Sequence, residues 1–183
     1  MRPFLLILLT ATALLAPASR LRAADEPTRE QQVQAAFVFN FMQFVEWPAD
    51  AFADSKSPLV VAVVGGDGLA AAMEKALADK AIAGRSIVLK RYAMASQVEK
   101  GCHVVVLAWP ERDSLKLVRE RLVGTPALLV GEGESFCRDG GTIRLFNEEN
   151  RVRFEINPRA AERAKLKIAA KLLKLAKIYD ESD

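Results

Sequence analysis

A glycine-rich turn is the segment of the sequence that most resembles a ligand-binding motif. Three glycines within residues 65–68 surround Asp67, between an apolar run and a predicted helix, where backbone N–H groups can bind a phosphate. The dinucleotide-binding spacing G-x-G-x-x-G is absent, and no Lys-Ser or Lys-Thr pair follows as in a P-loop. The segment is therefore interpreted as a tight turn in which Asp67 caps the following helix.

His103 is the only histidine, and it follows Cys102 at the start of a predicted strand. Neighbouring side chains on a strand point to opposite faces, so these two cannot easily form a nucleophile–base pair. Zinc would need more ligands than one histidine and two cysteines 35 positions apart. Glu132 and Glu134 lie in a glycine-rich loop, where solvated carboxylates are usual. We therefore expect no catalytic residue, no metal and no cofactor, and interpret His103 as structural.

The two cysteines are predicted not to bond to each other. Cys102 lies just before a predicted strand at 104–108, and Cys137 lies several residues after another at 127–130. If these strands run parallel, the two cysteines lie beyond opposite ends of the strands. Five strand residues span roughly 17 Å, whereas a disulfide requires Cα atoms within about 7 Å of each other.

Residues 1–24 have the features of an export signal. Arg2 precedes an apolar run at 4–15, and small residues at 16–18 form an A-x-A cleavage site. The run is shorter than the roughly 20 residues of a permanent membrane helix. We expect cleavage after Ala18 or nearer Ala24, which leaves one domain at 25–183 in an oxidising compartment. Cleavage after Ala24 also removes three arginines, and the formal charge of +3 becomes 0, so no nucleic-acid partner is expected.

Alternating strands and helices predict an α/β domain. Thr28, with Gln31 three positions on, forms a capping box for a helix that ends near Trp47. Helices at 69–78 and 111–122 separate buried apolar strands, which implies a three-layer domain with a mostly parallel central sheet. The predicted strands are 59–64, 85–91, 104–108 and 127–130.

A C-terminal antiparallel hairpin and a final helix follow. Segments 142–146 and 151–156 alternate apolar and polar residues around a four-residue loop, with Arg153 and Glu155 facing outward. Asn157 can cap a helical region from Pro158 to about Tyr179, either continuous or broken near Lys165.

Two features suggest interaction surfaces. The segment 158–179 has seven basic and one acidic residue, a local charge of +6, and its lysines fall at helical spacing. These lysines form a stripe, which is either a solvated face or a surface that attracts an acidic partner or anionic lipid. Phe39 is rotated about 200° from Phe37 on the first helix and either points to an interface or packs in the core. The stripe comprises Lys167, Lys171, Lys174 and Lys177.

Segments 35–52, 140–157 and 161–179 together resemble the YfiR-like periplasmic family, long known only as a domain of unknown function. The resemblance implies a compact periplasmic α/β domain that forms homodimers. It also implies repression of an inner-membrane diguanylate cyclase through the cyclase's periplasmic sensor domain, which lowers cyclic-di-GMP production. An outer-membrane peptidoglycan-associated lipoprotein would sequester the repressor. Better-known members have intrachain disulfides built from more cysteines than the two of this chain.

The same resemblance assigns partner contact to the hairpin and the helix after it, which nominates Arg153 and Glu155. With Lys167, Lys171 and Phe39, these are the predicted partner-binding residues. The alternative is a periplasmic small-ligand binding protein or enzyme that uses the carboxyl ends of the parallel strands. Its site would be lined by loops 65–68, Trp109-Pro110 and 131–133. A purely structural envelope protein is a third possibility.

Overall fold

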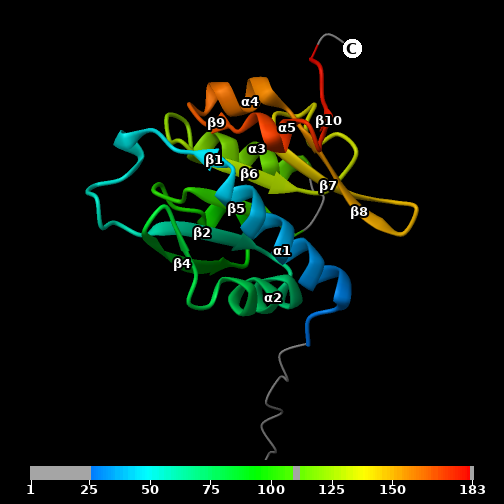
Figure 1. Ribbon diagram of the computed structural model, residues 1–183, viewed down its shortest axis with the longest axis horizontal. Helices are drawn as coiled ribbons and strands as arrows, with labels where there is room; N and C mark the ends of the chain where they lie inside the picture. Colours follow the sequence, from blue (N-terminus) through cyan, green and yellow to red (C-terminus); the bar gives the residue numbers. More distant parts are fainter. Residues whose placement is uncertain (1–25, 109–111, 182–183) are drawn as a thin grey trace, which may run out of the picture.

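The computed structural model describes residues 26–108 and 112–181 and is built around an eight-stranded sheet (Figure 1). The predicted signal at 1–24 and the loop Trp109-Pro110 lie outside the described residues. In spatial order the strands are β10 (Lys177–Ile178), β8 (Arg151–Ile156), β7 (Ile143–Glu148), β6 (Leu128–Gly131), β5 (Val104–Leu107), β2 (Leu59–Val64), β4 (Arg85–Tyr92) and β3 (Ala81–Ile82).

The strands from β4 to β7 are all parallel, which confirms the predicted α/β class. The β7–β8 and β3–β4 pairs are antiparallel, and β10 pairs parallel with β8. A separate two-stranded sheet joins β1 (Val45–Glu46) to β9 (Lys167–Ile168). Two single turns of 3-10 helix lie at Ala49–Ala51 and Ala95–Gln97.

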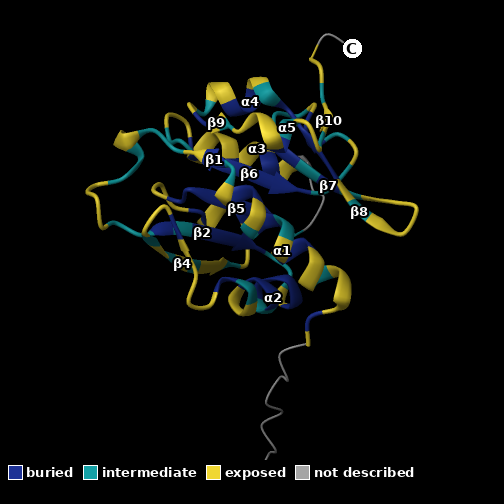
Figure 2. Ribbon diagram, in the orientation of Figure 1, coloured by how far each residue is buried: buried dark blue, intermediate teal, exposed yellow. Residues whose placement is uncertain are grey.

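Two apolar clusters, one on each face of the sheet, make the domain three-layered. Figure 2 shows that the central strands of the sheet are buried. Alternate residues of β2 divide between them: Val61 and Val63 join the larger cluster, and Ala62 joins the smaller. Helices α1 (Arg29–Gln43) and α2 (Asp67–Leu77) cover the larger cluster, and α3 (Arg112–Arg121) covers the smaller.

The capping prediction is confirmed for α1 and wrong for α2. The Thr28 hydroxyl accepts from Gln31 N, and the Gln31 side chain accepts from Thr28 N, which completes the capping box. The cap of α2 is Gly66, with a left-handed φ of +61°, and Asp67 is the first helical residue. The tight βα turn needs positive φ at its cap, which favours glycine there. Asp67 still places a negative charge at the helix N-terminus.

The hairpin turn is shorter than predicted. Glu149 and Asn150 have φ values of +51° and +58°, as in a two-residue type I′ turn, so β7 continues to Glu148. The prediction that Glu155 faces outward is also wrong. Glu155 is 5% exposed, because β10 and Arg144 cover it.

The predicted final helix is replaced by four short elements. Asn157 caps α4 (Pro158–Arg163) as expected, but the chain then turns at Lys165, where φ is +57°. It continues as β9, α5 (Ala170–Leu173) and β10. The edges of β1 and β8 offer backbone partners that override the local helical spacing. The four lysines therefore do not form a stripe on one helix.

His103 is built into the fold through both ring nitrogens. Val60 N donates to its Nδ1 at 3.0 Å, so Nε2 carries the proton and donates to Ala51 O at 3.0 Å. The imidazole stacks on the Phe52 ring, with 4.4 Å between the two ring centres. The Arg85 Cζ lies 3.8 Å from the centre of the same Phe52 ring. Burial lowers the pKa of His103. These contacts require the neutral imidazole.

The free energy of unfolding should decrease as the pH is lowered below about 6.5, because of His103. Its pKa is depressed in the folded state, so on acidification the unfolded chain takes up this proton first. Its contribution is complete above the unfolded pKa of about 6.5 and is lost as the pH falls through the folded pKa. Urea unfolding between pH 7.5 and 5 measures this. The His103→Asn variant should have a flatter profile over that range, and an unchanged profile would contradict the assignment.

Both cysteines are buried free thiols. Burial raises the pKa of the Cys137 thiol to about 12, and Cys137 Sγ donates to Glu155 O at 3.8 Å. Burial also raises the pKa of the Cys102 thiol. Because the thiolate is the reactive form of cysteine, both thiols are unreactive at neutral pH.

Candidate partner-binding surface

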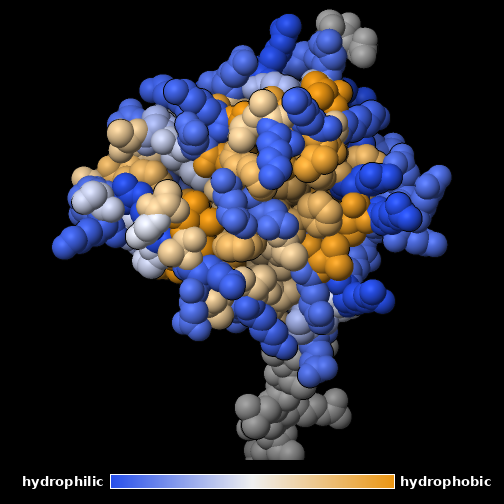
Figure 3. All heavy atoms as spheres, viewed as in Figure 1, coloured by the Kyte–Doolittle hydropathy of each residue, from blue (hydrophilic) through white to orange (hydrophobic). Residues whose placement is uncertain are grey.

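Apolar side chains gather over α1 and α5 on one face of the domain, with charged groups around them (Figure 3). We call this the α1–α5 surface. Leu175, which follows α5, and Ile178 in β10 are 69% and 47% exposed. Phe37, Phe44 and Leu173 are half-buried and also pack on the larger core cluster.

The β1–β9 pairing brings two predicted partner-binding lysines to this surface. Lys167 pairs with Glu46, and Ala169 N donates to Phe44 O at 2.8 Å, so the basic segment lies against the end of α1. The Lys171 ammonium lies 5.8 Å from the centre of the Phe44 ring. Both lysines are exposed. Tertiary pairing therefore places cations beside the aromatic end of α1.

The hairpin candidates have different roles. Arg153 is exposed and lies 3.6 Å from Glu148 across the hairpin. Glu155 is buried and bonded to Arg144 at 2.9 Å, with the Lys177 ammonium 3.6 Å away. Arg153 is thus available for contact, whereas Glu155 acts by positioning two cations.

Phe39 is half-buried and packs on the larger core cluster. It combines features of both readings of the sequence, core packing and partial exposure. Phe37 lies against Phe154 of the hairpin at 5.9 Å between ring centres, and Phe39, about 200° away around α1, lies on the other flank of this helix.

Sequence reasoning missed Arg144. This residue lies opposite Glu155 in the hairpin register, and its guanidinium lies 4.6 Å from the centre of the Phe146 ring. The opposite charges of Arg144 and Glu155 at facing positions were the available signal, but recognising it requires the correct register.

A hollow of about 180 Å³ lies between α1 and the hairpin. Gln34 Nε2 donates to Glu132 across it, and Asn147 Nδ2 donates to Glu30, so side-chain hydrogen bonds join α1 to the hairpin and to the loop after β6. Burial raises the pKa of Glu132, and the nearby Glu30 charge adds to the effect. These contacts set the orientation of the hairpin relative to α1.

Two of the three loops of the alternative hypothesis line separate hollows, and the third, Trp109-Pro110, lies outside the described residues. Gly65 lines an apolar hollow of about 330 Å³ with Met94 and Leu117, whereas Glu132 and Gly133 line the separate hollow beside the hairpin. No group of three or more metal-binding side chains occurs within residues 26–108 and 112–181. In the same ranges, no helix has the length and apolarity to cross a membrane.

The sheet and its surfaces define a three-layer α/β domain, and a solved structure shares this fold. A conserved domain protein from Vibrio cholerae O1 biovar El Tor superimposes with a TM-score of 0.54 and 12% sequence identity. The match covers 84% of this chain and 61% of that protein's chain. No curated protein matches this sequence. The chain belongs to the YfiR/HmsC-like family, whose model matches residues 31–177.

Proposed function

We propose that this protein is a periplasmic regulator that acts by binding and not by catalysis. Its partner is the periplasmic sensor domain of an inner-membrane diguanylate cyclase, whose repression lowers cyclic-di-GMP production. A peptidoglycan-associated lipoprotein of the outer membrane is a second partner, which sequesters the regulator. YfiR/HmsC-like family membership over residues 31–177 is the observation that carries this proposal.

The α1–α5 surface supports binding on physical grounds. Large exposed apolar side chains such as Leu175 supply area whose burial favours association. Lys167 and Lys171 border this area and would steer an acidic partner onto it. Arg153 adds an exposed cation on the hairpin, on the face opposite to that of Phe154, which packs on the larger core cluster. The proposal includes export through cleavage of the signal at 1–24 and association of two copies.

Combining Lys171→Glu with Leu175→Asp should weaken binding of the cyclase sensor domain at least 30-fold. The change reverses a steering charge and places a carboxylate in an apolar contact, a loss of about 2 kcal/mol or more. Titration calorimetry with the periplasmic sensor domain of an inner-membrane diguanylate cyclase from the same organism measures the effect.

The matched control combines Lys80→Glu with Met94→Asp, which makes the same kinds of change at exposed residues outside the α1–α5 surface. This control should bind as the unmodified protein does. Equal loss in both variants would reject the α1–α5 surface. Failure of the unmodified protein to bind any cyclase sensor, with unchanged cyclic-di-GMP after gene deletion, would reject the function itself.

A further inference from the structure

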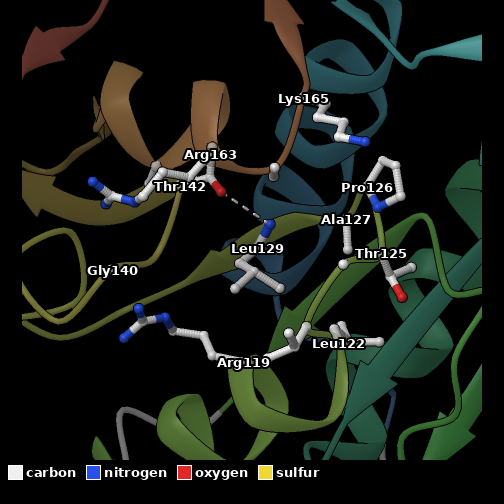
Figure 4. A pocket seen from close by; sticks show the side chains of 14 residues that line it. Arg119, Leu122, Thr125, Pro126, Ala127, Leu129, Gly140, Thr142, Arg163 and Lys165 are labelled. Carbon is white, nitrogen blue, oxygen red and sulfur yellow. Dashed lines mark hydrogen bonds between the residues drawn. The ribbon is translucent and has the colours of Figure 1, made fainter.

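A hollow of about 190 Å³ lies between the C-terminal ends of α3 and α4, away from the residues assigned to partner binding (Figure 4). Buried apolar side chains form its floor: Leu122, Ala127 and Leu129. Its volume is below the roughly 300–1,000 Å³ of sites for drug-sized ligands, so a smaller molecule fits it.

The charged side chains that line this hollow are all basic. Arg119, Arg163 and Lys165 come from α3, α4 and the turn after α4. Figure 4 shows the two guanidinium groups at one end, on either side of Gly140, and Lys165 near Pro126 at the other. Cationic groups from three separate segments therefore line one hollow with an apolar floor.

The protein holds Arg119 in place. Its Nη1 donates to Asp139 O at 2.7 Å, and the guanidinium packs directly on Gly140. A Cβ at position 140 would lie 2.6 Å from the Arg119 Cζ, and the φ of Gly140 is +94°. Only glycine meets both conditions without displacing the arginine.

The Arg163 guanidinium donates two hydrogen bonds to the Glu181 carboxylate, with nitrogen–oxygen distances of 2.7 and 3.1 Å. The buried Asn157 also donates to Glu181, and these bonds lower the pKa of that carboxyl to about 2. Glu181 offsets the charge of Arg163, and Asp113 and Asp139 line the adjoining hollow that shares both arginines. Arg119 and Lys165 are the other two cations in the lining of the proposed site. A guanidinium has five N–H donors, more than Arg119 or Arg163 uses in these described contacts.

We propose that this hollow binds a small organic monocarboxylate with an apolar body, such as a medium-chain alkyl carboxylate. The carboxylate lies between Arg119 and Arg163, and the chain lies over the floor formed by Leu122 and Leu129. The C-terminal ends of α3 and α4 border the hollow, and their partial negative charge opposes any anion there, a dianion more than a monoanion. The apolar floor must therefore supply part of the affinity. The inference is independent of the proposed cyclase partner.

Titration calorimetry of the purified protein with octanoate tests the proposal, with octanol, acetate and inorganic phosphate as comparison ligands. Octanoate should bind at least tenfold more tightly than each of the three, because only octanoate has both the charge and the chain. If octanol binds as tightly as octanoate, the cations do not contribute to octanoate binding. If acetate or phosphate binds as tightly as octanoate, the apolar floor does not contribute to it. Either result overturns the proposal.

Two variants locate the binding. Combining Arg119→Gln with Arg163→Gln should weaken octanoate at least tenfold and leave octanol unchanged. Ala164→Phe keeps all three cations and fills the hollow from its rim, so it should weaken octanoate by a similar factor. Lys80→Gln is the charge control and should have no effect. If folded Ala164→Phe protein binds octanoate normally, the site is elsewhere and the proposal is rejected.

Discussion

Replacing Glu155 with alanine should lower the free energy of unfolding by about 3 kcal/mol or more. The Glu155 side chain is 6% exposed, and that of its partner Arg144 is 13% exposed. Removing the carboxylate leaves the Arg144 guanidinium buried without its 2.9 Å partner, and uncompensated buried charges typically cost about 3–5 kcal/mol. Lys177, which bonds β10 to the sheet edge, also loses its contact with Glu155. Urea unfolding at pH 7 measures the change.

The matched control is Glu148→Ala, which breaks the exposed ion pair with Arg153 in the same hairpin. It should cost less than about 1 kcal/mol, because solvent screens exposed pairs. Replacing Arg144 by Met and Glu155 by Leu together should recover most of the lost stability, since no buried charge then remains unpaired. Equal small losses for Glu155→Ala and Glu148→Ala would show that the buried pair contributes no more than a surface pair.

Replacing Phe41 with alanine should destabilise the domain by about 3–5 kcal/mol. Phe41 is fully buried, and its ring centre lies 5.9 Å from that of Phe37 and 5.0 Å from that of Phe154. The resulting cavity would lie between α1, which carries part of the α1–α5 surface, and β8, which is one strand of the hairpin. Thermal or urea unfolding measures the loss.

Phe39→Ala is the comparison within the same helix. Because Phe39 is half-buried, its truncation removes less apolar area from the core and leaves less of a cavity. Its stability cost should be well below that of Phe41→Ala, whereas its effect on partner binding should be larger than its effect on stability. A cost equal to that of Phe41→Ala would assign Phe39 to the core alone.

Local sequence signals sufficed for the parallel part of the sheet. A continuous apolar run such as 59–64 predicts a strand covered on both faces, and the structure has β2 at those residues. The capping box at Thr28 and the cap at Asn157 were also readable, because each depends on groups within three residues. The family resemblance was recognisable from three segments that the family model also spans.

The last part of the chain was decided by tertiary contacts. Residues 158–179 have helical spacing, but β1 offers an edge to β9, and β8 offers one to β10. The burial of Glu155 likewise follows from the pairing of β10 and from the position of Arg144. These partners are remote in sequence, so local propensity has no access to them.

The sequence by itself determined the α/β class, the main strands and the caps at Thr28 and Asn157, since each depends on residue type and short-range spacing. Tertiary structure alone decided which cations meet which apolar groups. Lys171 lies over Phe44, and Arg119 lies on Gly140 near Arg163, only because distant segments pack together. Surfaces and hollows are made by such packing, which the order of residues along the chain does not display.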